Sequence, residues 1–279
     1  MTEVRASRWE GRTAEALAAE WGIPALHLFE RVGSTNDAAR ALAEEGVPAG
    51  TAVLAEEQTA GRGRGGRRWV SAPGLGIWLS MVLRPFELPS PGLLPLRMGI
   101  AAAAVLEPFA RPGAVQVKWP NDLLVAGRKL GGILCEGSWE SAAPAFVVAG
   151  IGINAGHLPD DFAEELRPHA TSLRIASGWS PPRAEVAGAL ARTLAALPAR
   201  FAATLDEREL GEMERRDALR GREVQVSGDP PVSGTALGIN PHGALLVRTG
   251  AGVLRAVRSG TVRLAAPLPG ESPFYAPSG

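Results

Sequence analysis

The stretch Gln58-Thr59-Ala60-Gly61-Arg62-Gly63-Arg64-Gly65-Gly66-Arg67-Arg68-Trp69 is the feature around which the rest of this chain can be organised. From Gly61 to Arg68 it consists of four glycines and four arginines. Glycine lets successive backbone N–H groups turn toward one anion, and arginine adds a charged planar fork that matches carboxylate or phosphate. We therefore expect a loop that orders around an anionic ligand, the alternatives being a solvated basic loop or a nucleic-acid patch.

The segments on either side of this loop predict strands and helices in alternation. A β-rich run at 51–56 precedes the loop and another strand at 76–83 follows it, so Gln58 lies where a strand ends. A hairpin is expected at Ala126-Gly127, where a polar turn joins two apolar strands. Other apolar runs predict strands at 26–32, 115–119 and 146–153, and helices at 13–21, 38–45, 93–109, 183–205 and 206–219.

A polar run, Gly33-Ser34-Thr35-Asn36-Asp37, precedes the second helix. Ser34 or Thr35 is a good N-cap and Asp37 favours the first turn, so these residues could serve only to start the helix. The alternative is that hydroxyl, amide and N–H groups at a helix start bind a small polar ligand. The spacing by itself favours capping.

Composition narrows the class of protein. A chain of 279 residues forms one large domain or one large and one small domain, and its formal net charge of zero gives no general attraction to nucleic acid or anionic membrane. The single cysteine, Cys135, fits a reducing compartment, and no stretch reads as a membrane span or signal peptide, so we expect a cytoplasmic protein. The four histidines show no metal-ligand spacing, so no direct protein metal site is expected.

The C-terminal part changes to short β segments separated by turns. Four such segments, at 222–226, 232–239, 244–248 and 253–257, predict a small barrel with an excess of arginine. The expected domains are 1–218, which would carry the main site, and 219–266. The tail 267–279 is rich in Pro, Gly and Ser and is expected to be disordered.

Two phosphate-binding motifs do not fit. Gly150-Ile151-Gly152-Ile153-Asn154-Ala155 follows a strand and matches a dinucleotide fingerprint, but no helix with a clear apolar period comes next. A strand that ends in a tight turn explains it better. A P-loop is excluded because no Gly-Lys-Ser/Thr follows the glycines.

Taken together, five segments in order resemble those of biotin–protein ligases, over roughly residues 25 to 265. They are Gly33-Ser34-Thr35-Asn36, Gln58 with Gly61-Arg62-Gly63-Arg64 and Trp69, Lys118-Trp119-Pro120-Asn121-Asp122, Lys129-Leu130-Gly131-Gly132-Ile133, and Gly150-Ile151-Gly152-Ile153-Asn154. The resemblance implies an α/β (α+β) fold, a mixed sheet like that of class II aminoacyl-tRNA synthetases followed by an SH3-like barrel. It also implies an ATP-dependent ligase that makes biotinyl-5′-AMP and transfers the biotinyl group to a lysine of a biotin carboxyl carrier protein.

The resemblance also implies roles for individual residues. The catalytic residues would be Arg64, Lys129, Asp122 and Lys118, with Asp122 orienting the incoming lysine amine. Biotin would be bound by Ser34, Thr35, Asn36, Gln58, Arg62, Gly63, Arg64, Lys129 and Gly132. ATP and the adenylate would be bound by Arg62, Arg64, Trp69, Lys118, Asn121 and Asn154. Trp69 would stack on adenine or, alternatively, only pack in the core. Mg²⁺ is expected with ATP rather than at a site of its own.

Many members of this family carry a DNA-binding domain ahead of the catalytic domain. Only 32 residues precede Gly33, so we expect a ligase that does not bind DNA or membrane. The resemblance allows a homodimer through an edge of the sheet. A lipoate- or octanoyl-transferring ligase and a non-enzymatic biotin sensor are the two alternatives.

Overall fold

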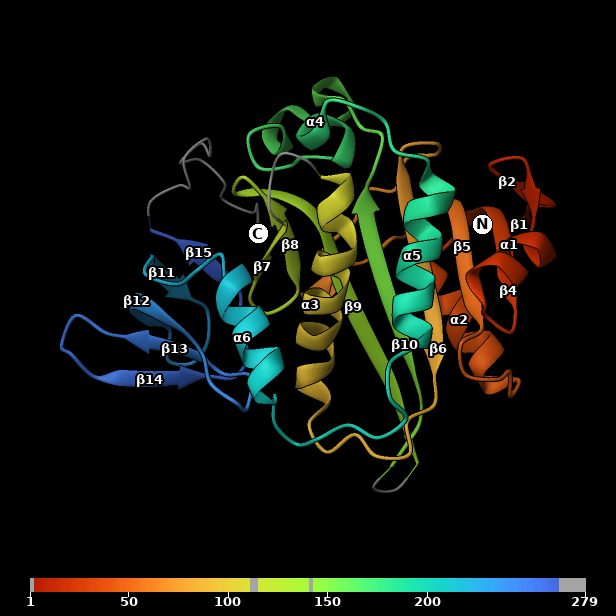
Figure 1. Cartoon of the computed structure of the whole chain (residues 1–279). Helices are drawn as coiled ribbons and strands as arrows, with labels where there is room; N and C mark the ends of the chain where they lie inside the picture. Colours follow the sequence, from red (N-terminus) through yellow and green to blue (C-terminus); the bar gives the residue numbers. More distant parts are fainter. Residues whose placement is uncertain (1–2, 111–114, 141–142, 266–279) are drawn as a thin grey trace.

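The structure, a computed structural model, describes residues 3–110, 115–140 and 143–265, so the predicted disordered tail at 267–279 lies outside the described residues. Figure 1 shows a large sheet crossed by helices, with a smaller sheet at one end. The large sheet has the order β1-β4-β5-β6-β10-β9-β8-β7, and β4 and β5 run parallel while its other neighbours run antiparallel. Its strands are β1 Val4–Arg5, β4 Leu26–Val32, β5 Ala52–Gln58, β6 Gly76–Leu83, β7 Val115–Lys118, β8 Asp122–Val125, β9 Arg128–Glu140 and β10 Ala143–Asn154.

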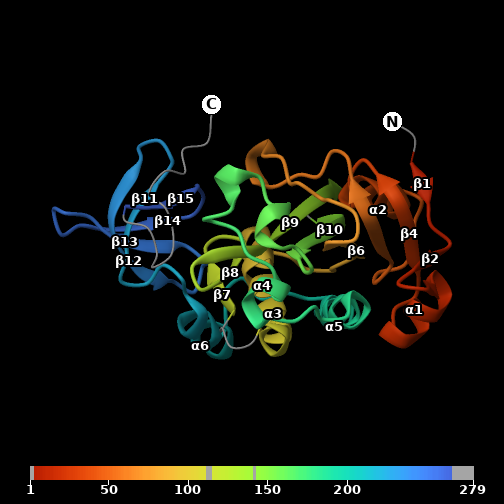
Figure 2. The ribbon, with the colours of Figure 1, turned by 90° about the horizontal axis from the view of Figure 1, so that it is seen from above.

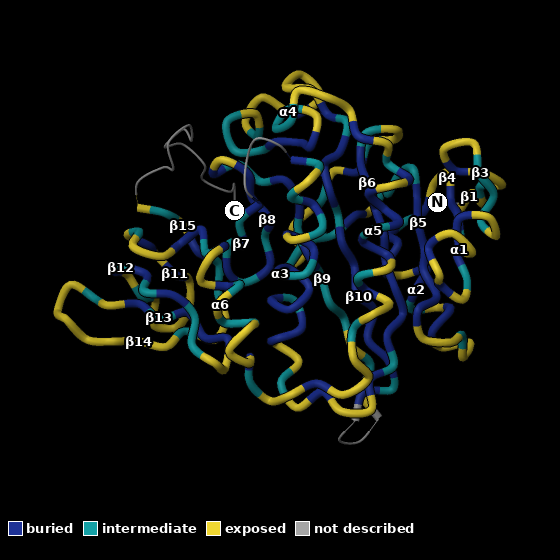
Figure 3. The backbone as a smooth tube through the Cα atoms, in the orientation of Figure 1, coloured by how far each residue is buried: buried dark blue, intermediate teal, exposed yellow. Residues whose placement is uncertain are grey.

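Helices cover both faces of this sheet. α3 (Leu94–Leu106) and α5 (Arg183–Ala195) lie on one face and α2 (Thr35–Glu44) on the other, as Figures 1 and 2 show. Successive residues of a strand point to opposite faces, so Leu54 joins the core beneath α3 and α5 while Val53 joins the core beneath α2. A strand covered on both faces needs a continuous apolar run, and every residue of β6 is accordingly buried. Figure 3, in which buried residues are dark blue, shows that this buried core follows the middle strands of the sheet.

α3 is apolar except for one charged residue, Arg97. Contrary to the sequence-based expectation, the helical run Pro91–Phe109 is long and apolar enough to cross a membrane, with a mean hydropathy of 1.3. A core helix passes the same test, and 56% of the qualifying window is buried inside this protein. Its composition follows from its place against the sheet, where α5, α6 and β7 also pack on it.

The expected elements are present, but two helices are shorter than predicted. The helix expected at 183–205 ends at Ala195, and Leu197 and Pro198 follow; proline disfavours helical geometry in the residue before it. The helix expected at 206–219 is α6, Glu207–Arg216. α1 (Ala14–Trp21) and α4 (Leu173–Ser177) are short helices, and the N-terminal strands β1, β2 (Arg8–Trp9) and β3 (Arg12–Thr13) were not predicted.

The smaller sheet is antiparallel and has the order β14-β13-β12-β11-β15. Its strands are β11 Glu223–Val226, β12 Val232–Ile239, β13 Leu245–Arg248, β14 Leu254–Val257 and β15 Val262–Leu264. Four were predicted; β15 was missed because three residues carry too little pattern. This sheet is packed firmly on the larger one, since Trp119 Nε1 donates to the Gly243 carbonyl at 2.9 Å and Val224 and Leu245 belong to the main core cluster. The domain boundary at 218/219 stays a prediction.

Candidate active site

One cavity of about 440 Å³ brings together all the residues that the sequence analysis assigned to a site. It opens along the carboxyl end of β5, the start of α2, and strands β8, β9 and β10, and the segment 260–265 of the smaller sheet closes its far side. The predicted residues that line it are Ser34, Thr35, Asn36, Gln58, Arg62, Gly63, Arg64, Trp69, Lys118, Asn121, Asp122, Lys129, Gly132 and Asn154.

The glycine–arginine loop, residues 61–69, forms a narrow ribbon on the cavity. Trp69 N donates to the Gly61 carbonyl at 2.8 Å, and Gly63 N donates to the Arg67 carbonyl at 2.7 Å. Gly65 and Gly66 make the turn at its tip with φ of 66° and 73°, a region that favours glycine. The loop therefore has a defined path here, and its ordering around an anion stays a prediction.

The first arginine of the loop, Arg62, forms ion pairs with two carboxylates. Arg62 donates to both carboxylate oxygens of Asp37, at 2.7 and 2.5 Å, and lies 3.6 Å from Glu136. The hydrogen bond and charge of Arg62 hold the pKa of Asp37 below its ordinary value despite partial burial, so the pair is ionised near neutral pH. Because Asp37 lies in the first turn of α2, the base of the loop is fastened to that helix.

The second arginine has a different environment. Arg64 is half-buried, and burial lowers the pKa of its guanidinium although Asp122 lies near enough to oppose this. The side chain of Arg64 makes no hydrogen bond or ion pair with any other described residue. A partly desolvated cation of this kind favours an incoming anion.

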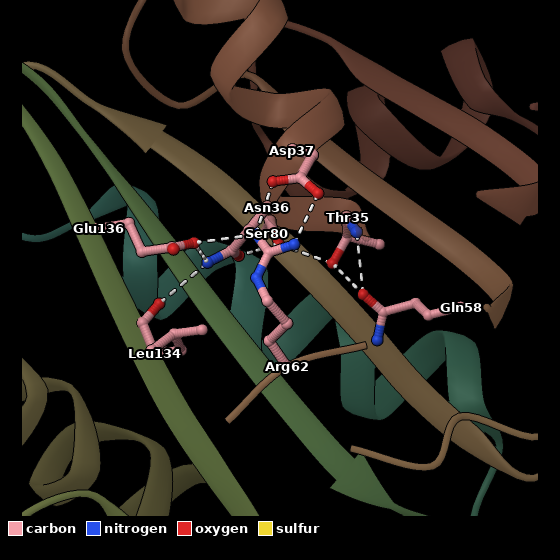
Figure 4. Close-up of polar contacts among 8 residues, drawn as sticks. All are labelled: Thr35, Asn36, Asp37, Gln58, Arg62, Ser80, Leu134 and Glu136. Atoms are coloured by element: carbon pink, nitrogen blue, oxygen red, sulfur yellow. Dashed lines mark hydrogen bonds and ion pairs between the residues drawn. The ribbon is translucent and has the colours of Figure 1, made fainter. Parts of the chain in front are cut away.

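The polar residues at the start of α2 do more than cap the helix, because they also hydrogen-bond to side chains of neighbouring strands. Ser34 occupies the N-cap position without a capping side-chain hydrogen bond, so the capping interpretation is wrong for its hydroxyl. Thr35 N donates to Gln58 Oε1 at 2.8 Å, and Gln58 Nε2 donates to Ser71 Oγ at 2.8 Å. Asn36 Nδ2 donates to Glu136 Oε2 at 2.6 Å. Figure 4 shows the side chains of α2 meeting Gln58 from β5 and Glu136 from β9.

Charged groups gather at the other end of the cavity. β8 and β9 meet in the predicted hairpin, where Ala126 and Gly127 have φ of 49° and 77°. This pairing places Lys129 Nζ 2.6 Å from Asp122 Oδ1 and 5.2 Å from the centre of the Trp69 ring. Burial raises the pKa of Asp122, but the charge and hydrogen bond of Lys129 outweigh it, so the net pKa lies below its ordinary value. The aspartate therefore stays a carboxylate near neutral pH.

Two predicted amides already bond to the backbone. Asn121 Nδ2 donates to the Ile133 carbonyl at 2.7 Å, and Asn154 Nδ2 donates to the Thr171 carbonyl at 3.0 Å. Within the part of the chain that the structure describes, no hydrogen bond reaches the side-chain oxygen of either residue, so that oxygen can accept from a ligand. Lys118 pairs in register with Asp122 across β7 and β8, which brings a further cation to this end.

Trp69 has both the surroundings of a packed residue and a place on the cavity wall. A Cβ at Gly152 would lie 3.1 Å from its indole ring, and Trp78 meets it edge-on with ring centres 6.2 Å apart. It is nevertheless only partly buried and lines the cavity. Stacking on adenine stays a prediction, and core packing accounts for one face of the ring.

The glycines of the segment 150–155, which matched a dinucleotide fingerprint, have a packing role in the sheet. Gly150 and Gly152 lie inside β10, within the strand that the sequence predicted at 146–153. A Cβ at Gly150 would lie 2.2 Å from Asn36 Oδ1, so glycine is needed there for α2 to approach the sheet. No helix follows at once: the chain continues into 3₁₀ turns at Pro159–Asp161 and Glu164–Leu166.

Gly150→Ala should therefore destabilise the protein by about 1–3 kcal/mol, the usual cost of overpacking a filled site. Urea unfolding of the variant measures this. Gly92→Ala is the matched control because its added Cβ meets nothing within 4 Å. Equal stability of the two variants would mean that α2 shifts freely at this contact.

Sequence reasoning missed Ser80, Glu136 and the segment 260–265. Ser80 had a detectable signal, since it is the one polar residue in the apolar run of β6 and is fully buried. Glu136 had none, because a glutamate on a long strand usually faces water. The 260–265 segment reaches the cavity only through the packing of the two sheets.

Comparison with known proteins agrees with this geometry. Residues 28–154 match the biotin/lipoate A/B protein ligase family, and residues 220–264 match the biotin protein ligase C-terminal domain. The bifunctional ligase/repressor BirA of Bacillus spizizenii is 44% identical over 157 residues, covering 56% of this chain and 48% of that protein. The match thus spans about half the length of that relative.

Two further relatives align over most of their length. The biotin–[acetyl-CoA-carboxylase] ligase of Mycobacterium tuberculosis is 34% identical over 243 residues, covering 85% of this chain and 88% of that protein. The structure of the biotin protein ligase from Aquifex aeolicus in complex with biotin and ATP superimposes with a TM-score of 0.71 and 29% identity, covering 86% of this chain and 97% of that one. The chain therefore belongs to the biotin protein ligases.

Proposed function

We propose that this protein activates biotin with ATP to form biotinyl-5′-AMP and transfers the biotinyl group to a lysine of a biotin carboxyl carrier protein. The observation that supports this proposal most strongly is that the two ends of the cavity differ in charge. One end offers the uncharged hydroxyl and amide groups of Thr35 and Gln58, and the other end offers the cations Arg64, Lys118 and Lys129. Biotin has the same polarity, with a ureido ring at one end and a carboxylate at the other.

In the first step, a biotin carboxylate oxygen attacks the α-phosphorus of ATP and the bond to the β-phosphate oxygen breaks, releasing pyrophosphate. Negative charge must be brought together and then redistributed, so fixed cations lower the barrier. Lys129 and Arg64 would neutralise the biotin carboxylate and α-phosphate oxygens. Trp69, Asn121 and Asn154 would bind the nucleotide, and Gly63 and Gly132 would allow the ligand close to the backbone.

In the second step, the carrier lysine amine attacks the acyl carbon, an amide forms and AMP leaves with the electron pair of the acyl–oxygen bond. The amine loses one proton. Asp122 stays ionised because Lys129 lies beside it, so its carboxylate can accept a hydrogen bond from the amine and orient it. Closure of the loop over the adenylate would exclude water from a hydrolysable anhydride.

Magnesium belongs to the substrate in this proposal. Among the described residues, no group of three or more His, Cys, Asp or Glu side chains could hold a metal ion. Of the two carboxylates that line the cavity among the described residues, Asp122 is paired with Lys129 and Asp161 accepts from the backbone N–H of Leu158. Mg²⁺ would therefore enter bound to the phosphates of ATP, whose charge it neutralises.

We also propose a cytoplasmic ligase that does not bind DNA. The net charge is zero, and α1, the helix nearest to a helix-turn-helix pattern, buries Leu17 and Trp21 in the main core. A gel-shift assay that detects operator binding would contradict this.

A homodimer through an edge of the large sheet would use the β1 edge. The opposite edge, β7, is already partly covered, since Ala218 N donates to the Val117 carbonyl at 3.1 Å. Analytical ultracentrifugation measures the oligomeric state in solution.

The test of the proposed function is biotin-dependent exchange between ATP and labelled pyrophosphate, run beside the same assay with lipoate. Exchange with biotin alone is the expected result. Exchange with lipoate alone would assign the chain to the lipoate-transferring alternative. Silence with both, in folded protein that binds biotin by calorimetry, would favour a non-enzymatic biotin sensor.

A further inference from the structure

Two glycines leave room for larger side chains on the face of the large sheet that lines the cavity. Gly132 of β9 pairs with Gly152 of β10, and Gly132 also pairs with Asp122 of β8. Directly paired residues share a face of the sheet, so these three residues form one row. A Cβ at Gly132 would lie 3.6 Å from Lys129 Cε, and one at Gly152 would lie 3.1 Å from the Trp69 ring. Lys129 and Trp69 therefore lie next to each other over the two glycines.

The Lys129 ammonium has two partners along this row. Its Nζ lies 2.6 Å from Asp122 Oδ1 and 5.2 Å from the centre of the Trp69 ring. A cation within about 6 Å of the centre of an aromatic ring is attracted by the ring quadrupole, and the attraction is strongest for tryptophan. The carboxylate on β8 and the ring over β10 thus hold the ammonium from both sides of β9.

The two partners differ in what they leave for a ligand. An ammonium group has three N–H donors, and a hydrogen bond to the Asp122 carboxylate uses one of them while the negative charge offsets the positive one. An aromatic ring attracts the ammonium without a net charge of its own. The Trp69 ring therefore holds Lys129 in place while its charge and its other N–H donors stay available to the oxygens of an anionic ligand.

The Trp69 ring is itself fixed by packing. Its backbone N–H donates to the Gly61 carbonyl at 2.8 Å, and its ring meets Trp78 edge-on and lies against Gly152. Trp69 Nε1 is buried, and no described residue provides it with a hydrogen-bond partner. A substitution that removes the indole nitrogen therefore breaks no hydrogen bond among the described residues, which allows the aromatic face to be tested by itself.

We propose that Trp69 is a positioning residue that holds the Lys129 ammonium over Gly132 by cation–π attraction, so that its charge acts on the reacting carboxylate and phosphate oxygens. The inference rests on the proposed function, because adenylation of biotin supplies those oxygens. It adds to nucleotide binding by the same side chain, since stacking changes the affinity for ATP whereas the position of Lys129 changes the chemical step. Because Trp69 ends the glycine–arginine loop, the loop also determines where this lysine lies.

Trp69→Leu and Trp69→Phe test the proposal, because leucine has no aromatic face and phenylalanine keeps one with weaker attraction. At saturating biotin and ATP, kcat for pyrophosphate exchange should fall about three- to thirtyfold in Trp69→Leu, as for loss of one cation–π contact. Trp69→Phe should lie between Trp69→Leu and wild type. Loss of adenine stacking would raise the KM for ATP without changing this saturated rate, so the two roles are measured separately. Trp179→Leu, at an exposed tryptophan outside the cavity, is the matched control and should match wild type.

A double-mutant cycle gives a readout that a merely structural role would not move. If Trp69 acts through Lys129, then Trp69→Leu in a Lys129→Ala background should leave the saturated exchange rate within about twofold of that of Lys129→Ala. An unchanged kcat in Trp69→Leu would overturn the inference, as would a full further loss in the double variant. If Trp69→Leu does not fold by circular dichroism, Trp69→Phe replaces it in the same cycle. Absence of exchange in wild type would instead contradict the proposed function.

Discussion

Lys129→Ala is expected to lower the rate of biotin-dependent pyrophosphate exchange by about 10²–10³-fold, the usual cost of removing one fixed group that stabilises developing oxyanion charge. Lys129 Nζ lies between Asp122 and the Trp69 ring, at the cationic end of the cavity. Its removal also takes away the strongest of the charges that stabilise the Asp122 carboxylate, so the pKa of that carboxyl should rise although Lys118 and Arg67 remain. The measurement is initial exchange rate at saturating biotin and ATP.

The fold should survive this change, because the backbone of Lys129 carries its structural bonds. Its N–H donates to His169 and its carbonyl accepts from Thr171, at 2.6 and 2.9 Å, while its side chain is 38% exposed. Circular dichroism should therefore match wild type. Arg128→Ala, at the preceding position of β9 and outside the cavity, should keep near-normal exchange. Near-normal adenylation in Lys129→Ala would show that the role given to Lys129 is wrong.

Arg64→Ala is expected to release biotinyl-5′-AMP into solution and to spread biotin onto lysines outside the carrier. The half-buried Arg64 guanidinium has no carboxylate partner among the described residues, so an anionic ligand is its natural counter-ion. A hydrogen bond to a charged group contributes about 1.5–3 kcal/mol, so release should be faster by roughly ten- to a hundredfold. Quenched-flow release of labelled adenylate measures it, and mass spectrometry of a mixed lysate gives the selectivity.

Arg64→Lys separates charge from geometry, because lysine keeps the cation but loses the planar fork. We expect intermediate release. Arg200→Ala, which removes only the exposed partner of Glu87, should behave as wild type. If Arg64→Ala retains its adenylate and its selectivity for the carrier, then Arg64 does not close the site.

Most of the fold could be predicted from local pattern. Strands buried on both faces read as continuous apolar runs, so β6 was predicted with its correct bounds, and the turn at Ala126-Gly127 was correct because Gly127 takes positive φ at little cost. The three-residue β15 and the two-residue β1 were missed, since elements so short are formed by pairing with neighbours rather than by their own sequence.

The sequence by itself also predicted which residues line the cavity, because its glycine, arginine and polar motifs resemble, in the same order, those of biotin–protein ligases. Tertiary structure alone decided how those groups are used. The contact of Asn36 with Glu136 joins residues 100 positions apart, and that with Ser80 joins residues 44 apart. No local pattern specifies which side chains meet across a sheet, because register and helix packing bring them together only when the whole core forms.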